Sequence, residues 1–158
     1  MENQIKQFSQ NNYNTKETQN KPRLQTEEMN FKKVKEDERF IYYEGLATIS
    51  GKYQEYQPEV LLGGTLCFFV DEKTGNLIPK VSGDNRSPWF CFNDQGKAKR
   101  MFEINDNAIF NNKAVECIQG KATITISNYK IDKKQGEAFD TADIKEIISK
   151  ETYTTKCE

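Results

Sequence analysis

Residues 40–53 read FIYYEGLATISGKY, a run of aromatic and β-branched side chains that is interrupted by Gly45 and Gly51. Such a composition is typical of a β-strand. A glycine inside a strand usually marks a bulge or a sharp bend, which is how a strand of a closed barrel turns a corner. The stretch therefore predicts a long, bent strand of a small β-barrel.

The rest of the chain contains further β-prone runs, which are separated by polar turns. The last of them alternates apolar and polar side chains, as expected of a strand with one buried face. Pro79 cannot donate a hydrogen bond to a neighbouring strand, which favours an edge position for its run. Strands are predicted at Thr65–Val70, Leu77–Val81, Trp89–Phe92 and Ala122–Tyr129, of which the second and third are either one interrupted strand or two.

Two segments have helical spacing of their apolar residues. In residues 95–104, Ala98, Met101 and Phe102 share one helix face, and Asn93 or Asp94 can cap the first turn. In residues 141–150 the isoleucines at positions 144, 147 and 148 repeat in the same way. We therefore predict one helix between the third and fourth strands and a second at the C-terminus.

This order of elements indicates a mainly β fold, a five-stranded barrel of the oligonucleotide/oligosaccharide-binding (OB) kind with one capping helix. An SH3-like barrel and a small sandwich are the alternatives. Residues 1–37 are dominated by Asn, Gln, Lys, Glu and Thr and are predicted to be a disordered, flexible polar tail. Residues 38–158 are predicted to form a single domain.

The four cysteines are far apart, and none belongs to a Cys-x-x-Cys pair. The chain also has no histidine, so a structural zinc site is not expected, and no sequence pattern indicates a cofactor. Dispersed cysteines fit one or two disulfides in an exported protein, or buried thiols in a cytoplasmic one. Candidates for disulfides are Cys67, Cys91, Cys117 and Cys157; if Cys157 is paired, Cys117 is its expected partner.

Charge and hydropathy restrict the class of partner. With 23 basic and 24 acidic side chains, the chain lacks the positive field that drives binding to phosphate backbones. A protein or an oligosaccharide is therefore favoured as partner over a nucleic acid. The most apolar stretch, Val60–Val70, is about half as long as a membrane-spanning helix, so membrane insertion is not expected.

Aromatic residues cluster on strands that we expect to be neighbours, and basic residues lie around Trp89. If some of these rings face outward, they form a surface on which bases, sugars or side chains of a partner stack. The alternative is that one set of rings is core and the other is covered by the chain itself. The candidate ligand surface consists of Phe69, Trp89, Phe90, Phe92, Lys80, Arg86 and Lys97.

No catalytic pattern is present, since nucleophilic catalysis by serine or cysteine usually requires an imidazole base. We therefore predict a non-enzymatic binding module, exported to the periplasm or envelope of a bacterial cell. The first alternative is a cytoplasmic or nuclear subunit of a larger complex that binds single-stranded nucleic acid. The second is a hydrolase that uses carboxylates, for which candidates are Glu44, Glu55, Glu59 and Asp84.

Overall fold

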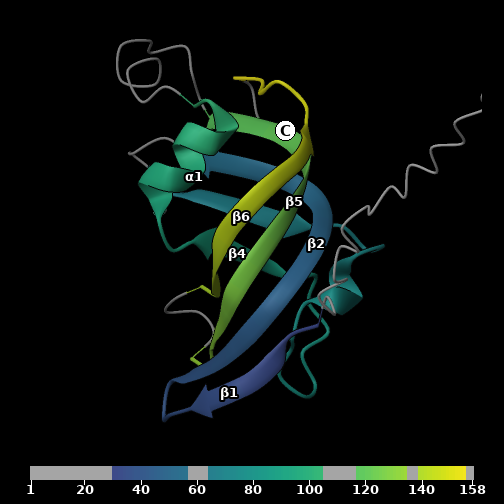
Figure 1. Cartoon of the computed structure of the whole chain (residues 1–158), viewed down its shortest axis with the longest axis vertical. Coiled ribbons are helices and arrows are strands. Elements are labelled where there is room, and N and C mark those ends of the chain that lie inside the picture. Colours follow the sequence, from purple (N-terminus) through teal and green to yellow (C-terminus); the bar gives the residue numbers. More distant parts are fainter. Residues whose placement is uncertain (1–29, 57–63, 105–116, 135–138, 156–158) are drawn as a thin grey trace, which may run out of the picture.

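The computed structural model describes residues 30–56, 64–104, 117–134 and 139–155. In these ranges the chain is mainly β, with six strands and one α-helix (Figure 1). The helix, α1, comprises Gln95–Phe102, and a single 3₁₀ turn, η1, comprises Gly75–Leu77. The strands are β1 (Lys32–Glu36), β2 (Phe40–Tyr56), β3 (Leu66–Val70), β4 (Trp89–Phe92), β5 (Cys117–Asp132) and β6 (Thr141–Lys150).

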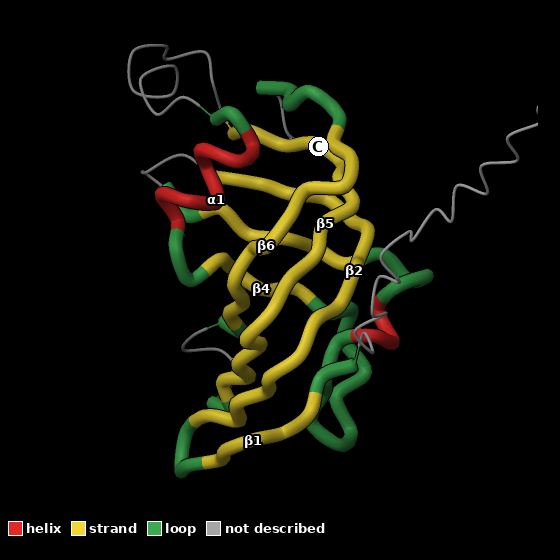
Figure 2. Tube along the Cα trace, in the orientation of Figure 1, coloured by secondary structure: helices red, strands yellow, loops and turns green. Residues whose placement is uncertain are grey.

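Five strands close into a ring in the order β2–β3–β4–β6–β5, and β5 pairs again with β2. Neighbouring strands in the ring are antiparallel except for β4 and β6, which are parallel. Strand β1 stands outside the ring and pairs with the first part of β2, as Figure 2 shows. The polypeptide thus forms one curved sheet with a single additional strand at its edge.

Strand β2 connects all these parts, because it pairs with β5 along nearly its whole length. On its other side it pairs first with β1 and then, from Gly51 onward, with β3. Gly51 permits this close approach: a Cβ atom at this position would lie 2.1 Å from the carbonyl oxygen of Phe69. A side chain here would push β3 away from β2, so the glycine is required where the ring closes.

The core lies inside the ring, because successive side chains of a strand point to opposite faces. Tyr53, Phe68, Phe90 and Tyr129 are among the largest side chains that are fully buried there. Helix α1 adds Phe102, whose ring centroid lies 4.3 Å from that of Tyr53. The helix therefore packs against one end of the ring, as predicted for residues 95–104.

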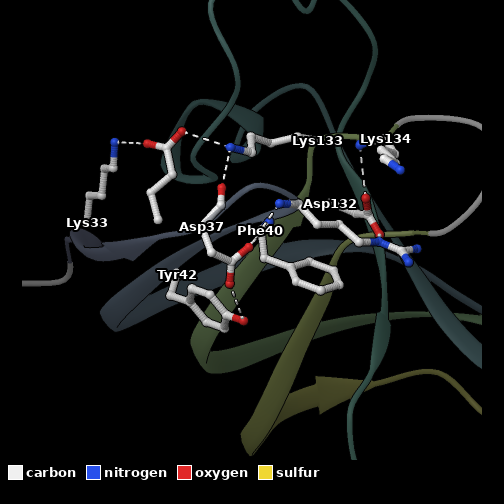
Figure 3. Close-up of polar contacts among 9 residues, drawn as sticks. Lys33, Asp37, Phe40, Tyr42, Asp132, Lys133 and Lys134 are labelled. Atoms are coloured by element: carbon white, nitrogen blue, oxygen red, sulfur yellow. Dashed lines mark hydrogen bonds and ion pairs between the residues drawn. The ribbon is translucent and has the colours of Figure 1, made fainter.

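Figure 3 shows how the turn between β1 and β2 is tied to the end of β5. The Asp37 carboxylate accepts hydrogen bonds from the backbone N–H groups of Arg39 and Phe40. Arg39 Nε donates to the buried carboxylate of Asp132 at 3.0 Å, and Lys133 donates to the carbonyl oxygen of Asp37. These polar contacts hold the two strand ends together at the end of the sheet where β1 is added.

The predicted C-terminal helix is wrong, since residues 141–150 form strand β6. Ile144 pairs with Ile126 of β5 and Ile147 pairs with Ile124, whereas Lys145 and Ile148 are extra residues in β-bulges. Each bulge adds one residue, so the side chains that face the core are three apart instead of two. This spacing imitates a helical repeat, which is why the sequence pattern misled the prediction.

Two further differences from the sequence expectations concern the edges of the fold. Residues 77–81 do not form a strand; Leu77 ends η1, and the chain continues as a loop to Pro88 in which Ile78 is buried. Residues 32–36, which we predict from the sequence to lie in the polar tail, form β1. All five of these residues are exposed, so no apolar pattern marked them as a strand. Residues 1–29 lie outside the described residues.

A disulfide joins Cys67 of β3 to Cys91 of β4, two residues that lie directly opposite each other in the strand pair. Of the two alternatives left open by the sequence, a disulfide or two buried thiols, the structure shows the disulfide for this pair. Cys117 is disulfide-bonded as well. Cys157, its expected partner, lies outside the described residues.

The close approach at Gly51 can be tested with Gly51→Ala. We expect a loss of unfolding free energy of about 2 kcal/mol or more, because the new Cβ overlaps backbone that cannot rotate away. The control is Gly96→Ala in the first turn of α1, where the nearest atom is the far end of the Arg100 side chain. Urea unfolding should show that this control is unchanged or more stable; equal stability of both variants would contradict the role of Gly51.

The disulfide between β3 and β4 closes a loop with a sequence separation of 24. Replacing both cysteines with alanine should lower the unfolding free energy by about 3 kcal/mol, because the unfolded chain regains conformational freedom. Non-reducing peptide mapping should recover a Cys67–Cys91 peptide pair, and a second pair that contains Cys117. A free thiol at Cys67 in oxidised protein would refute the assignment.

Candidate functional site

Alternation along β3 and β4 divides the predicted aromatic surface into two sets. Phe90 and Phe92 point into the ring, with exposed fractions of 0% and 3%. The prediction that these two rings contact a ligand is wrong, because they are part of the core. Phe69 and Trp89 point the other way and are partly exposed on the outer face of the sheet.

Phe69 and Trp89 lie directly opposite each other on β3 and β4. Their rings are nearly parallel, with an angle of 10° and a centroid distance of 5.7 Å. Phe139, just before β6, lies 6.2 Å from Trp89, and the Lys52 amine lies 5.6 Å from the Phe69 centroid. We call Phe69, Trp89 and Phe139 the aromatic platform. Phe69 and Trp89 stack on each other, so the platform offers a ligand the apolar ring area that this stack leaves partly exposed.

The predicted basic residues are less available than the sequence suggests. Arg86 binds Asp84 through two nitrogens, at 2.9 and 2.8 Å, and Lys80 donates to the carbonyl oxygen of Arg86. Both residues line a cavity together with Trp89. Lys97 belongs to α1 and donates to the carbonyl oxygen of Ile144, and it is not among the residues of that cavity.

This cavity lies beside the platform and has a volume of about 30 Å³. That is space for about one water molecule, so it cannot hold an organic ligand. In its wall the Tyr129 hydroxyl donates to Asp140 at 2.9 Å, and Asp140 also accepts the backbone N–H of Asp132. Burial raises the pKa of both Tyr129 and Asp140. The cavity therefore supports the base of the platform and does not form a binding site of its own.

A larger, open groove of about 620 Å³ begins at Phe69 and crosses the outer face of the sheet. We call it the wall groove. Most of the residues that line it are polar or charged, with charges of both signs, and three strands contribute hydroxyl groups. The lining residues are Ser50, Gly51, Lys52, Phe69, Asp71, Lys121, Ala122, Thr123, Ser149, Lys150 and Glu151.

The sequence analysis did not identify Phe139 or most of the wall groove. Alternation within β2 contained a signal, because Ile49 and Tyr53 are core residues and Ser50 and Lys52 must then face outward. No comparable signal was available for Phe139, whose position beside Trp89 depends on the parallel pairing of β4 with β6.

The carboxylates considered for hydrolysis have different environments. Glu55 is buried and forms an ion pair of 2.5 Å with Lys99, whereas Asp84 is bound by Arg86 in the loop before β4. Glu44 is exposed, and Glu59 lies outside the described residues. Over the part of the chain that the structure describes, no group of three or more Cys, Asp or Glu residues is arranged to hold a metal ion.

No protein-family model matches the chain, and neither a curated protein nor a solved structure shows significant similarity to it. Among the described residues, none of the helices has the length and apolar character needed to span a bilayer. The functional conclusion therefore depends on the geometry of the site alone.

The raised pKa of Asp140 predicts a pH dependence of stability. The folded state binds the proton of Asp140 more tightly than the unfolded state does. The contribution of Asp140 to stability therefore falls as the pH rises from the ordinary pKa of an aspartate toward the raised pKa of Asp140 in the folded protein. Asp140→Asn cannot titrate. Urea unfolding from about pH 3 to about pH 7 should show the wild type losing stability relative to this variant. A relative gain would mean that Tyr129 and the Asp132 N–H stabilise the ionised form more than burial disfavours it.

Proposed function

We propose that this chain is a non-enzymatic binding module with an OB-type barrel, and that it binds an oligosaccharide on the aromatic platform. The proposal of an OB-type barrel is supported by the closed ring of five strands, with one helix after the third strand of the ring, β4. In OB-type barrels the second and third strands carry the ligand-binding face. The corresponding strands here are β3 and β4, which contribute Phe69 and Trp89.

The observation that carries the proposal is the nearly parallel, partly exposed pair of Phe69 and Trp89. Area of these rings that stays in water contributes nothing to folding, so it is available to a ligand that covers it. A sugar ring has a flat apolar face and a polar rim. Such a ring can cover the platform while its hydroxyl groups bond to Ser50 and Thr123 in the wall groove. The hydroxyls of these two residues bond to each other at 2.8 Å, and each keeps further hydrogen-bonding capacity for a ligand.

Charge favours a sugar over a nucleic acid. The Asp84 carboxylate neutralises Arg86 beside the platform, and the net charge of the chain is −1. A polyphosphate ligand needs several unneutralised cations along its path. A single-strand nucleic-acid-binding module nevertheless uses the same kind of stacking surface, and it remains the second candidate.

Export from a bacterial cell, to the periplasm or envelope, is part of the proposal. It is supported by the Cys67–Cys91 disulfide and by the disulfide bonding of Cys117, because such bonds persist in oxidising compartments. A role without catalysis is supported by the lack of histidine.

Trp89 is the only tryptophan, so its fluorescence reports directly on the platform. Titration with a hexasaccharide of N-acetylglucosamine, with an alternating glucuronate and N-acetylglucosamine hexasaccharide, and with a twelve-nucleotide thymidine strand should change its emission only for a ligand that stacks. We expect saturable changes with at least one of the oligosaccharides. Phe69→Ala should weaken that binding about tenfold or more, as expected for the loss of a stacking partner.

The matched control is Phe40→Ala, which removes a partly exposed ring that packs against Tyr42 at a different part of β2. This variant should bind like the wild type. Binding of the thymidine strand alone, reversed by added salt, would favour the nucleic-acid alternative. An unchanged Trp89 emission with all three probes would refute the platform as a binding site.

A further inference from the structure

A row of four side chains crosses the outer face of the sheet, one from each of four adjacent strands. Trp89 of β4 is opposite Phe69 of β3, and Phe69 is opposite Lys52 of β2. Lys52 is in turn opposite Lys121 of β5. Because neighbouring strands are about 4.8 Å apart, the row is about 14 Å long. It has an aromatic half and a cationic half, and Phe69, Lys52 and Lys121 line the wall groove.

The cationic half is unfavourable for the fold by itself. Like charges directly opposite each other on neighbouring antiparallel strands are destabilising. Some lysines are neutralised by carboxylates, such as Lys99 by Glu55 and Lys150 by Glu103, whereas Lys35 and Lys130 lie over aromatic rings. Among the described residues, neither Lys52 nor Lys121 lies within ion-pair distance of a carboxylate.

We propose that Lys52 and Lys121 together bind a carboxylate of an acidic oligosaccharide, while an adjoining sugar of the same chain stacks on Phe69 and Trp89. This inference rests on the proposed function and specifies its ligand class. An anion between the two amines would offset their repulsion and add charge-assisted hydrogen bonds. The length of the row requires a ligand of several sugar units and not a single sugar.

The neighbours of the lysine pair favour carboxylates that are spaced along the chain. Asp71 and Glu151 also line the wall groove, and they would repel a ligand that carries a charge on every unit. Ser149 and the mutually bonded pair Ser50 and Thr123 add hydroxyl groups to the same lining. A saccharide with alternating acidic and neutral units suits this lining better than a phosphodiester backbone does.

The test compares two forms of one probe by calorimetry. One is the hexasaccharide of alternating glucuronate and N-acetylglucosamine, and the other is the same molecule with its carboxylates reduced to alcohols. We expect the wild type to bind the acidic form about tenfold more tightly, with a preference that decreases as salt rises. In Lys52→Gln/Lys121→Gln the preference should disappear, while the reduced form binds as before.

The matched control is Lys35→Gln/Lys130→Gln. It removes the same charge and also affects two lysines that lie over aromatic rings, at 5.2 and 4.7 Å from the ring centroids of Tyr42 and Phe40. This control should keep the preference for the acidic form. The Lys52/Lys121 variant should unfold at about the same temperature as the wild type, because relief of the like-charge pair offsets the lost contact of Lys52 with the Phe69 ring.

The possible failures are distinguishable. Equal affinity of the wild type for both forms, with loss of both in Phe69→Ala, would overturn the inference and leave the proposed function intact. Binding of neither form would overturn the inference. It would overturn the proposed function as well only if the N-acetylglucosamine hexasaccharide also leaves the emission of Trp89 unchanged. Loss of preference in the control as well as in the Lys52/Lys121 variant would show an effect of net charge only, and would also overturn the inference.

Discussion

Strand β2 is the constraint on which the rest of the structure depends. It pairs with β5 along its length, with β1 at its start and with β3 from Gly51 onward, so every other part of the ring is positioned through it. The absence of a side chain at Gly51 lets β3 approach. Once β2 and β3 are paired, β4 follows through β3, and β6 is placed between β4 and β5.

Closure of the ring also separates the two faces of each strand. Phe68 and Phe90 face the interior and stack there, whereas their neighbours Phe69 and Trp89 stack on the outside. The same alternation places Lys52 next to Phe69 and opposite Lys121. The interior set stabilises the fold by burying apolar area. The exterior row buries less apolar area than the interior set, and it is the surface on which the proposed ligand contact rests.

Several elements could be predicted because their signals are local. The helix predicted over residues 95–104 is indicated by its apolar spacing and its Asp94 cap. The strand Trp89–Phe92 is indicated by its β-prone residues. The error at residues 141–150 arose because the bulge at Lys145 changed the spacing of Ile144 and Ile147. A bulge depends on the register with β5, so it cannot be recognised from these ten residues alone. For the candidate site, Phe69 and Trp89 were foreseen, but Phe90 and Phe92 were not separated from them.

The sequence by itself determined the β-rich composition, the positions of most strands, the helix at residues 95–102 and the lack of imidazole chemistry, because these follow from side chains and their local spacing. Only the tertiary structure decided that Cys67 bonds to Cys91, that Phe139 lies beside Trp89, and that two lysines complete a row with two aromatic rings. These residues are distant along the chain, and only the pairing of their strands brings them together. Strand register is set by the packing of the whole ring and is not encoded in any single segment.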